Sequence, residues 1–289
     1  MKRIQSVCLG ALLSLSACTP SVIVEEAESV SEPVQTRIID FLPQFVELSG
    51  SIADWQPSRS ASLSELATTL SYWDYMDGLC HSKKAQTTSS VLPIEMDYGS
   101  HNLYFLAHSS TESEQDGFLF TPSKVTETFW ADFPLEVNEE TGASLNVPLN
   151  RVVSKVSIIL KDAMPEGISR MRMTVGGLIR TLDIETGNGK LETAEDYTLE
   201  WEIGSSYVGR EGLSFTMFSF TPTPSEEFDV SVSLEALSSG GEVLFGGECA
   251  SVPLLRNRCT EVSCSLFGTT VGFSATVAED WVPPLEIEM

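Results

Sequence analysis

Cysteines and histidines are the side chains of this sequence best suited to metal binding or catalysis, and their spacing argues against both. The 289 residues contain three histidines, His81, His101 and His108. Outside the first eighteen residues lie four cysteines, Cys80, Cys249, Cys259 and Cys264. No two of them have the C-x-x-C spacing of a zinc site, and four are too few for a disulfide framework in a chain of this length. We expect free thiols, no metal site and no cofactor, although export would allow some of these cysteines to oxidise.

Motifs for nucleophilic or phosphate chemistry are also missing. The sequence has no G-x-S-x-G turn, and Gly187-Asn-Gly189-Lys190 lacks the upstream glycine of a phosphate-binding loop. Asp183-Ile-Glu-Thr-Gly187 is similar to the start of a calcium loop but lacks the remaining ligands and the closing glutamate. Some of the 41 acidic residues must be neighbours, yet no spacing marks a carboxylate pair for glycoside hydrolysis. We predict that the protein is not an enzyme and has no catalytic residues.

The balance of charge excludes two classes of partner. Lys and Arg total 17, whereas Asp and Glu total 41, which gives a formal net charge of −24. A protein that binds the phosphate backbone of nucleic acid needs a basic surface, and so does a protein held to an anionic membrane by charge. We expect no nucleic acid partner, and any membrane attachment must come from something other than the protein surface.

The amino-terminal residues indicate export and lipid attachment. Lys2 and Arg3 precede an apolar stretch, residues 7–15, that is too short to span a bilayer. The following Leu15-Ser-Ala-Cys18 resembles the lipobox of bacterial lipoproteins, in which the cysteine thiol is acylated. This resemblance implies a lipoprotein signal peptide over residues 1–17 and a lipid such as palmitate on Cys18. The alternative is an ordinary signal peptide with a chance cysteine.

The residue after the lipobox bears on the location of the lipoprotein. Residue 19 is Thr rather than the Asp that retains lipoproteins in the inner membrane. The resemblance therefore implies a protein anchored in the outer membrane by its lipid and exposed at the cell surface.

Alternating apolar and polar residues dominate the rest of the chain. The clearest example is residues 228–236, where Phe, Val, Val, Leu and Ala alternate with Asp, Ser, Ser and Glu. Such period-two patterns are typical of antiparallel strands with one face in a core, and their number predicts an all-β chain of antiparallel β-sandwiches. Residues 18–37 lack the pattern and are expected to form a flexible tether. The pattern becomes more regular after the acidic residues 138–142, which predicts one sandwich over 38–147 and a second over 148–289.

Shorter segments carry specific predictions. Asp77-Gly78 predicts a tight hairpin turn. Apolar residues three and four apart over 63–70 predict a short amphipathic helix. Pro43, within the apolar run 38–48, predicts an edge strand or an interruption. Lys155 and other polar residues that alternate with the apolar ones over 152–160 are expected on a solvent-facing side.

Several segments, in this order and spacing after a lipobox, resemble one known family. They are Ser64-Glu-Leu-Ala-Thr-Thr-Leu-Ser-Tyr-Trp-Asp-Tyr-Met-Asp-Gly78, Gly99-Ser-His-Asn-Leu-Tyr-Phe-Leu-Ala-His-Ser109, Thr128-Phe-Trp130, Leu149-Asn-Arg-Val-Val-Ser-Lys-Val156, Gly176-Gly177, Asp183-Ile-Glu-Thr-Gly187 and Arg256-Asn-Arg-Cys-Thr260. Together they are similar to the fimbrillin-A-associated anchor proteins, lipoprotein subunits of type V pili. The aromatic-rich piece usual near Thr128 is reduced here to Phe129 and Trp130.

The resemblance implies a fold, a role and partners. It implies two tandem transthyretin-like β-sandwich domains without catalytic residues. It implies an anchoring, structural or minor subunit of a cell-surface pilus, or fimbrium, that takes part in cell adhesion. Its partners would be other pilus subunits, joined by strand donation, and a host or bacterial surface ligand is a further candidate.

Both ends of the folded part have a role in this scheme. In shaft subunits of such pili a protease cuts at an arginine, and loss of the first strand opens a groove for a neighbour; Arg37 is the matching position here. An anchor must keep its lipid, so we expect Arg37 to stay uncut. Beyond Pro283-Pro284, the residues Leu285, Ile287 and Met289 alternate with glutamates and are a candidate donor strand. A frayed terminus is the alternative.

A second class of protein would share these properties. An outer-membrane glycan-binding lipoprotein of a nutrient-uptake system would also be all-β, lipidated and acidic. Such a protein needs exposed aromatic side chains, and five tryptophans are available: Trp55, Trp73, Trp130, Trp201 and Trp281. Trp73 and Trp201 stand in strand-like runs, where a place in the core is at least as well supported.

Overall fold

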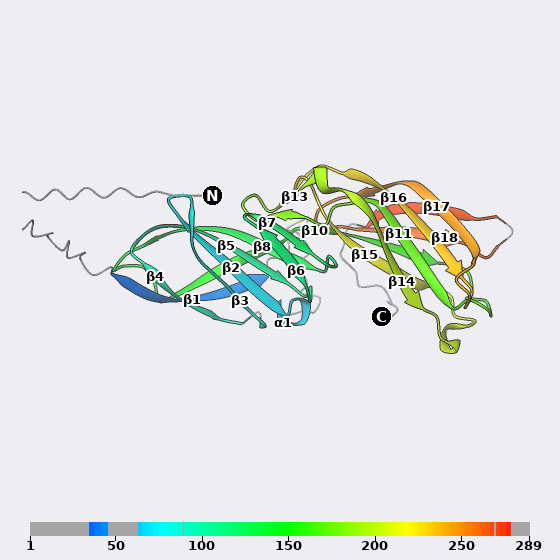
Figure 1. Ribbon diagram of the computed structural model, residues 1–289, viewed down its shortest axis with the longest axis horizontal. Coiled ribbons are helices and arrows are strands. Elements are labelled where there is room, and N and C mark those ends of the chain that lie inside the picture. Colours follow the sequence, from blue (N-terminus) through cyan, green and yellow to red (C-terminus); the bar gives the residue numbers. More distant parts are fainter. Residues whose placement is uncertain (1–34, 46–62, 89, 269, 279–289) are drawn as a thin grey trace, which may run out of the picture. The chain divides into compact units, whose positions relative to one another are not determined.

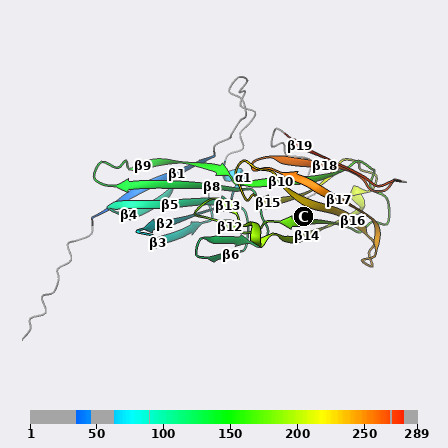
Figure 2. The same ribbon diagram turned by 90° about the horizontal axis from the view of Figure 1, so that it is seen from above.

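The chain is almost entirely β-structure. The computed structural model describes residues 35–45, 63–88, 90–268 and 270–278, and Figure 1 and Figure 2 show them from two directions. The predicted all-β sandwich fold is confirmed. The first half of the chain contains β1 (Thr36–Phe45), α1 (Leu63–Leu66), β2 (Thr69–Met76), β3 (Leu79–Gln86), β4 (Leu92–Asp97), β5 (Gly99–His108), β6 (Ser113–Asp116), β7 (Leu119–Pro122), β8 (Thr128–Val137) and β9 (Ser144–Arg151).

The second half continues the same kind of structure. Its elements are β10 (Val153–Leu160), β11 (Arg170–Leu178), β12 (Leu182–Asp183), β13 (Asn188–Gly189), η1 (Leu191–Thr193), β14 (Glu195–Glu202), η2 (Ser205–Tyr207), β15 (Leu213–Phe220), β16 (Phe228–Leu237), β17 (Val243–Leu254), β18 (Cys259–Ser265) and β19 (Gly272–Ala278). No helix in the described residues is long and apolar enough to cross a membrane.

The strands of the first half form one sheet that folds over on itself. Its order is β3-β2-β5-β8-β9-β1-β4, and β8 and β9 are joined at two residue pairs, Phe129 with Arg151 and Trp130 with Asn150. On either side of this corner the sheet forms two layers, β4-β1-β9 and β3-β2-β5-β8. Side chains from both layers, including Phe41 and Phe105, share one core. The first half is therefore a sandwich closed along one side.

The second half repeats this arrangement with two separate sheets. Their orders are β15-β10-β18-β19 and β14-β11-β16-β17, and residues of both, among them Phe215 and Trp201, share a second core. In each half the first strand lies between an antiparallel and a parallel neighbour: β1 between β4 and β9, and β10 between β15 and β18. These two parallel pairs are exceptions to the predicted antiparallel pairing. The second half also has β19, which extends its sheet beyond β18.

A small sheet brings together segments of both halves. Its order is β13-β12-β7-β6, so the β6–β7 hairpin of the first half pairs with the short strands of the second. Phe118, in the turn of that hairpin, stacks on Tyr75 with ring centroids 4.4 Å apart. The predicted boundary between residues 147 and 148 falls within β9. Leu149 belongs to the first core and Val152 to the second, but the second core also contains side chains of the first half, among them Trp73, Tyr104 and Leu106. The division into two domains stays a prediction.

Several local predictions can be compared with the structure. Asp77 and Gly78 have φ angles of 51° and 77°, as the predicted tight turn between β2 and β3 requires. The predicted helix ends after one turn at Leu66, because Thr69 already begins β2 and pairs with His108 of β5. Pro43 lies where β1 has only β9 as a neighbour, since the pairing with β4 ends at Phe41, so its missing N–H leaves no gap in the ladder.

The prediction for the polar face of β10 is wrong. Ser154, Lys155 and Ser157 are at most 2% exposed, so β10 is buried on both faces. The Ser157 hydroxyl lies 2.6 Å from that of Ser214 on β15. Because β10 is flanked by β15 and β18, its polar side chains lie in the middle of a sheet and meet their neighbours rather than water.

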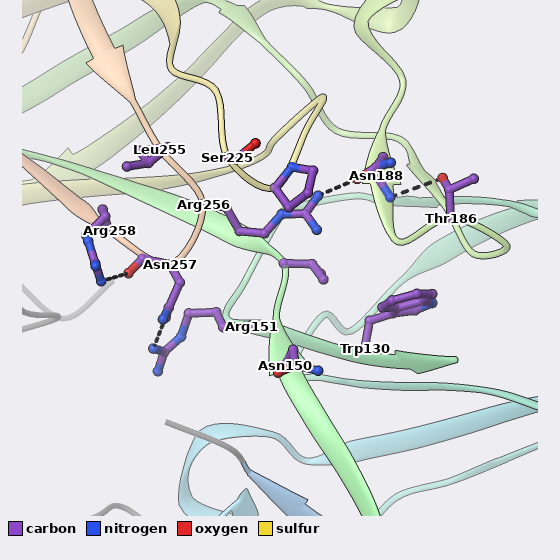
Figure 3. Close-up of a pocket in the computed structure, with 12 residues that line it drawn as sticks. Trp130, Asn150, Arg151, Thr186, Asn188, Ser225, Leu255, Arg256, Asn257 and Arg258 are labelled. Atoms are coloured by element: carbon purple, nitrogen blue, oxygen red, sulfur yellow. Dashed lines mark hydrogen bonds between the residues drawn. The ribbon is translucent and has the colours of Figure 1, made fainter. Parts of the chain in front are cut away.

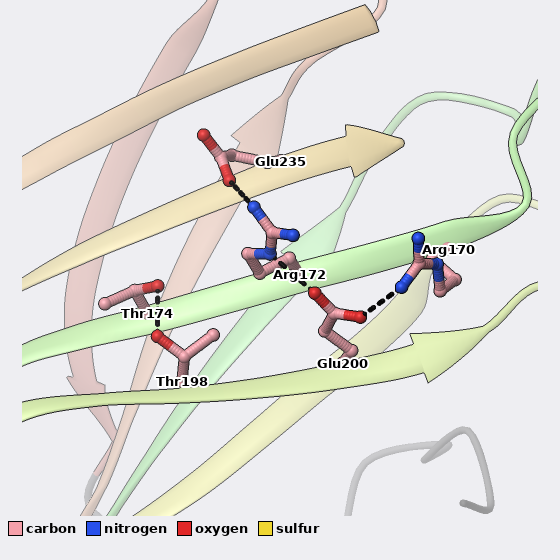
Figure 4. A network of polar contacts seen from close by, with 6 residues as sticks. All are labelled: Arg170, Arg172, Thr174, Thr198, Glu200 and Glu235. Atoms are coloured by element: carbon pink, nitrogen blue, oxygen red, sulfur yellow. Dashed lines mark hydrogen bonds and ion pairs between the residues drawn. The ribbon is translucent and has the colours of Figure 1, made fainter. Parts of the chain in front are cut away.

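The outer face of the β14–β11–β16 ladder carries a network of cross-strand ion pairs (Figure 4). Arg172 on β11 is opposite Glu200 on β14 and Glu235 on β16, with N···O distances of 2.7 and 3.2 Å. Arg170 adds a second contact to Glu200 at 2.7 Å. The hydrogen bond from Arg172 lowers the pKa of Glu200. These exposed pairs fix the register of neighbouring strands more than they stabilise the fold.

His108 is a buried histidine at the end of β5. Its side chain contacts Phe120, with ring centroids 5.0 Å apart, and its Nδ1 accepts a hydrogen bond from the Ser110 N–H. Burial lowers the pKa of His108 to about 4. The folded state therefore keeps this imidazole neutral where an unfolded chain would protonate it.

The pKa of His108 predicts a loss of stability in acid. Between the ordinary histidine pKa of about 6.5 and the folded value, the unfolded chain binds a proton that the folded chain does not, so the free energy of unfolding falls as pH falls. From pH 7 to pH 5 the loss through His108 is about 2 kcal/mol. Urea unfolding of the wild type and of His108→Gln at both pH values measures it. Between pH 7 and pH 5 the free energy of unfolding should fall by about 2 kcal/mol less in His108→Gln than in the wild type. An equal fall in the two proteins would contradict the lowered pKa of His108.

Candidate functional site

Most of the residues singled out at the two ends lie outside the described part of the chain. This applies to Cys18 and to Leu285, Ile287 and Met289 of the tail. Arg37 is described, and it is the second residue of β1. Its Nη1 donates a hydrogen bond to the carbonyl oxygen of Glu139 at 2.8 Å.

The position of Arg37 decides what a cut there would do. Ile39 and Phe41, which follow it on β1, are fully buried in the first core, and Phe41 contacts both Phe105 and Phe133. Cleavage after Arg37 would separate the preceding residues and leave Ile38–Phe45 in the sheet. A groove would open only if β1 itself were removed from between β4 and β9.

The structure separates the tryptophans by environment. Trp73 and Trp201 are 4% and 5% exposed and belong to the core, as expected from their strand positions. Trp55 and Trp281 lie outside the described residues. Trp130 is half-exposed and lines a pocket of about 500 Å³. It is thus the one tryptophan of the described part that a ligand can reach.

The pocket is built where five segments meet (Figure 3). Trp130 is the third residue of β8, Asn150 and Arg151 end β9, and Val152 lies between β9 and β10. The other residues come from three loops of the second half: Thr186 and Asn188, Pro224 and Ser225, and Leu255, Arg256, Asn257 and Arg258. The lining is apolar on some sides and carries amide, hydroxyl and guanidinium groups on others.

Trp130 is held in place by the turn between β12 and β13. Its Nε1 donates to the carbonyl oxygen of Ile184 at 2.7 Å. Gly187 in the same turn has a φ of 65°, and a Cβ there would lie 2.6 Å from the indole ring. A side chain at this position would therefore displace the ring, and only glycine suits both the backbone and the contact.

Arg256 links three of the loops. Its Nε donates to Thr221 Oγ1 at 2.8 Å, and its Nη2 donates to the Gly187 carbonyl oxygen at 2.9 Å and to Asn188 Oδ1 at 2.7 Å. Burial lowers its pKa to about 10, so it stays charged at neutral pH. Asn257 beside it has a φ of 56°, in the left-handed region that Asn tolerates better than most residues.

Arg151 lies on the other side of Asn257. Its Nη1 donates to Asn257 Oδ1 at 2.8 Å, and its Nη2 lies 3.5 Å from Glu127 Oε1. The guanidinium also lies 5.0 Å above the ring of Phe45 and 5.1 Å above that of Phe129. Arg151 therefore joins the end of β9 to β1, β8 and the 255–258 loop.

The remaining candidates for chemistry are dispersed. Cys80, Cys249, Cys259 and Cys264 form no disulfide bond among the described residues, and burial raises the pKa of Cys264 to about 12. Asp183, the first residue of the segment that is similar to a calcium loop, accepts a hydrogen bond from the Glu185 N–H in its own turn. Its Oδ2 lies 3.3 Å from Lys190 Nζ. In the part of the chain that the structure describes, no three His, Cys, Asp or Glu side chains lie close enough together to hold a metal ion.

His101 is the most enclosed polar side chain among the histidines. Its Nδ1 lies 2.8 Å from Asp74 Oδ1, and its Nε2 lies 2.9 Å from the carbonyl oxygen of Asp97. These contacts link His101 on β5 to Asp74 on β2 and to Asp97 at the end of β4. His101 does not line the pocket beside Trp130. We assign it a packing role.

Comparisons with known proteins show a shared fold. A solved structure of a candidate cell adhesion protein from Bacteroides ovatus matches with a TM-score of 0.52 and 10% identity, over 86% of this chain and 99% of the other. A candidate adhesin from Bacteroides ovatus matches with a TM-score of 0.51 and 8% identity, over 83% and 96%. Neither a protein-family profile nor a curated protein matches the sequence. At these identities the similarity extends to the fold.

Proposed function

We propose that this protein is a non-enzymatic, lipid-anchored adhesion protein of the cell surface that serves as an anchoring or minor subunit of a pilus. The fold that it shares with a candidate cell adhesion protein over most of both chains carries this proposal. The lipobox-like Leu15-Ser-Ala-Cys18 supports attachment to the outer membrane by lipid. The resemblance to fimbrillin-A-associated anchor proteins supports the more specific role.

Joining to other subunits would proceed by strand exchange. β17 is an edge strand, and three consecutive apolar residues on it, Val243, Leu244 and Phe245, are 46%, 43% and 39% exposed. An exposed apolar edge offers both unpaired backbone groups and apolar surface to an added strand. The apolar residues of the tail, which alternate with glutamates, have the pattern of such a strand.

The alternative, a glycan-binding lipoprotein of an uptake system, is favoured by one observation. Trp130 is accessible and lines a pocket with amide and hydroxyl groups. A pocket of this kind fits a small polar ligand, and it is compatible with either surface role. Attachment to a fibre separates the two roles, because only the pilus subunit requires it.

Lipid attachment is tested at Cys18. Replacing Cys18 by Ala should remove the acyl chain and release the protein from the outer membrane, since the acidic surface gives no electrostatic hold. Metabolic labelling with a palmitate analogue and membrane fractionation measure this, with Cys80→Ala as the control that keeps the lipobox. Membrane recovery equal to that of the control would exclude the lipid anchor.

Arg37 distinguishes an anchor from a shaft subunit. We expect the protein in purified fibres to keep its chain intact through Arg37, because a cut there would detach the lipid from the folded part. Amino-terminal sequencing and mass spectrometry of the fibre-bound protein give the answer. A mature amino terminus at Ile38 would exclude the anchor role; a polymerising role would in addition require β1 to leave the sheet.

The tail is tested by deletion. Removing residues 282–289 should weaken attachment of the fibre while the circular dichroism spectrum and the melting temperature stay unchanged, because a donor strand completes the neighbouring subunit rather than its own. The amount of fibre retained on cells is the measurement. A matched variant replaces only Leu285, Ile287 and Met289 by Ser. Full attachment in both variants would remove the tail from the mechanism.

A further inference from the structure

The pocket beside Trp130 has a charge opposite to that of the rest of the protein. The chain has 41 acidic and 17 basic residues, yet the pocket lining contains three arginines, Arg151, Arg256 and Arg258. Among the described residues that line it, none is acidic. Arginines that serve only to stabilise an acidic protein would be expected beside carboxylates, as Arg170 and Arg172 are.

Arg256 is the clearest departure from that expectation. All its hydrogen bonds in the described part of the chain go to neutral oxygens, of Thr221, Gly187 and Asn188, and none goes to a carboxylate. These bonds use Nε and Nη2. Nη1 is left without an acceptor among the described residues, and its two N–H groups remain available. A half-buried cation without a counter-ion is costly unless an anion joins it.

Arg258 adds a second uncompensated charge. Its Nη1 bonds to the carbonyl oxygen of Asn257 at 3.3 Å, and no ion pair to it is found in the described residues. Arg151 differs, because Glu127 lies within 3.5 Å of it. The net excess of positive charge in the pocket therefore comes from the 255–258 loop.

The neutral part of the lining limits the kind of anion. Trp130 presents an apolar ring, and Asn150, Thr186, Asn188 and Ser225 carry side chains that can donate or accept hydrogen bonds. A volume of about 500 Å³ accommodates a ring-sized ligand rather than a bare ion. Sugars have this combination of apolar C–H faces and hydroxyl groups.

We propose that this pocket binds an acidic sugar, a uronic or sialic acid residue of a surface glycan, with its carboxylate on Arg256 and its ring beside Trp130, while Arg258 adds to the positive charge of the pocket. Guanidinium groups bind carboxylates through charge-assisted hydrogen bonds. Repulsion from the −24 of the chain is screened beyond about 8 Å in physiological salt, whereas the arginines act at contact distance.

An acidic peptide is the competing anion, and the site suits it less well. Peptide strands bind along sheet edges through a row of backbone hydrogen bonds. The pocket instead lies at the meeting point of loops and strand ends, and its polar groups come from side chains. The inference adds a ligand to the proposed surface role, and binding by the purified chain is tested apart from anchoring and fibre assembly.

The experiment measures binding to the full chain by isothermal titration calorimetry. The probes are glucuronate, galacturonate and N-acetylneuraminate, with glucose, acetate and a tri-glutamate peptide for comparison. At least one acidic sugar should bind about tenfold or more tightly than glucose and acetate, because both the carboxylate and the ring contribute. Binding of none of the three acidic sugars, equal binding of glucose or acetate, or tighter binding of the peptide would overturn the proposal.

Variants connect binding to the pocket. Arg256→Gln should weaken the sugar about tenfold, and Arg258→Gln should weaken it less, because Arg258 adds charge to the pocket without contacting the carboxylate. Arg210→Gln is the control: it makes the same change of charge at an exposed arginine beside Tyr207, outside the pocket, and should leave the affinity unchanged. Since Arg256 also links loops, Trp130→Leu, which removes the aromatic ring beside the sugar, decides the test if Arg256→Gln unfolds. An affinity equal to that of the wild type in Arg256→Gln or in Trp130→Leu would place the sugar elsewhere.

Discussion

The pairing of β1 on both sides is the constraint on which the first sandwich depends. The strand that comes first in the sequence lies between two strands that come later, and its Ile39 and Phe41 fill the space between the layers. The sheet can close only after the chain has reached β9, so this half is built from contacts that are distant in sequence. Other features of the first half, including the corner between β8 and β9 at Trp130 and the burial of Phe105, depend on β1 being in place between its two neighbours.

The region around the pocket, where strand ends and loops meet, is stabilised in a different way. Here the loops are held together by hydrogen bonds of Arg256, Asn257 and Arg151 rather than by the packing of apolar side chains. Trp130 and Gly187 set the distance between β8 and the β12–β13 turn. Four of the segments that carry the family resemblance, those at 128–130, 149–156, 183–187 and 256–260, contribute to this one place. A pocket built in this way can keep charge that a hydrophobic interior would exclude.

The sequence predicts the fold of this protein better than its pocket. Period-two alternation over 228–236 and the Asp77-Gly78 turn depend on neighbouring residues, and both are found as expected. The position of Lys155 was predicted wrongly because the alternation reports one buried face and does not reveal that the polar side chains of β10 stand among those of neighbouring strands, as Ser157 does beside Ser214 and Thr216 of β15. Likewise, the effect of Pro43 depends on where the β4 pairing stops, which is a property of the partner strand.

The sequence could not predict the pocket either, because the pocket depends entirely on which distant segments the fold brings together. Its residues are scattered from 130 to 258, and none of the five segments has a spacing that indicates a ligand. One signal was available: Arg256 and Arg258 stand close together in a chain poor in basic residues. The two arginines indicate an anion site only once the structure shows that no carboxylate of the described residues bonds to Arg256.

The position of β1 also has a mechanical consequence. A pull on the chain before Thr36 enters the fold along this strand, which has six residue pairs with β4 and six with β9. Tension along a strand axis loads both ladders in shear, so their hydrogen bonds must fail together rather than one after another. At the other end of the described chain, β19 has seven residue pairs with β18 and no second strand partner among the described residues. The amino-terminal end is therefore the stronger point of attachment for a body under tension.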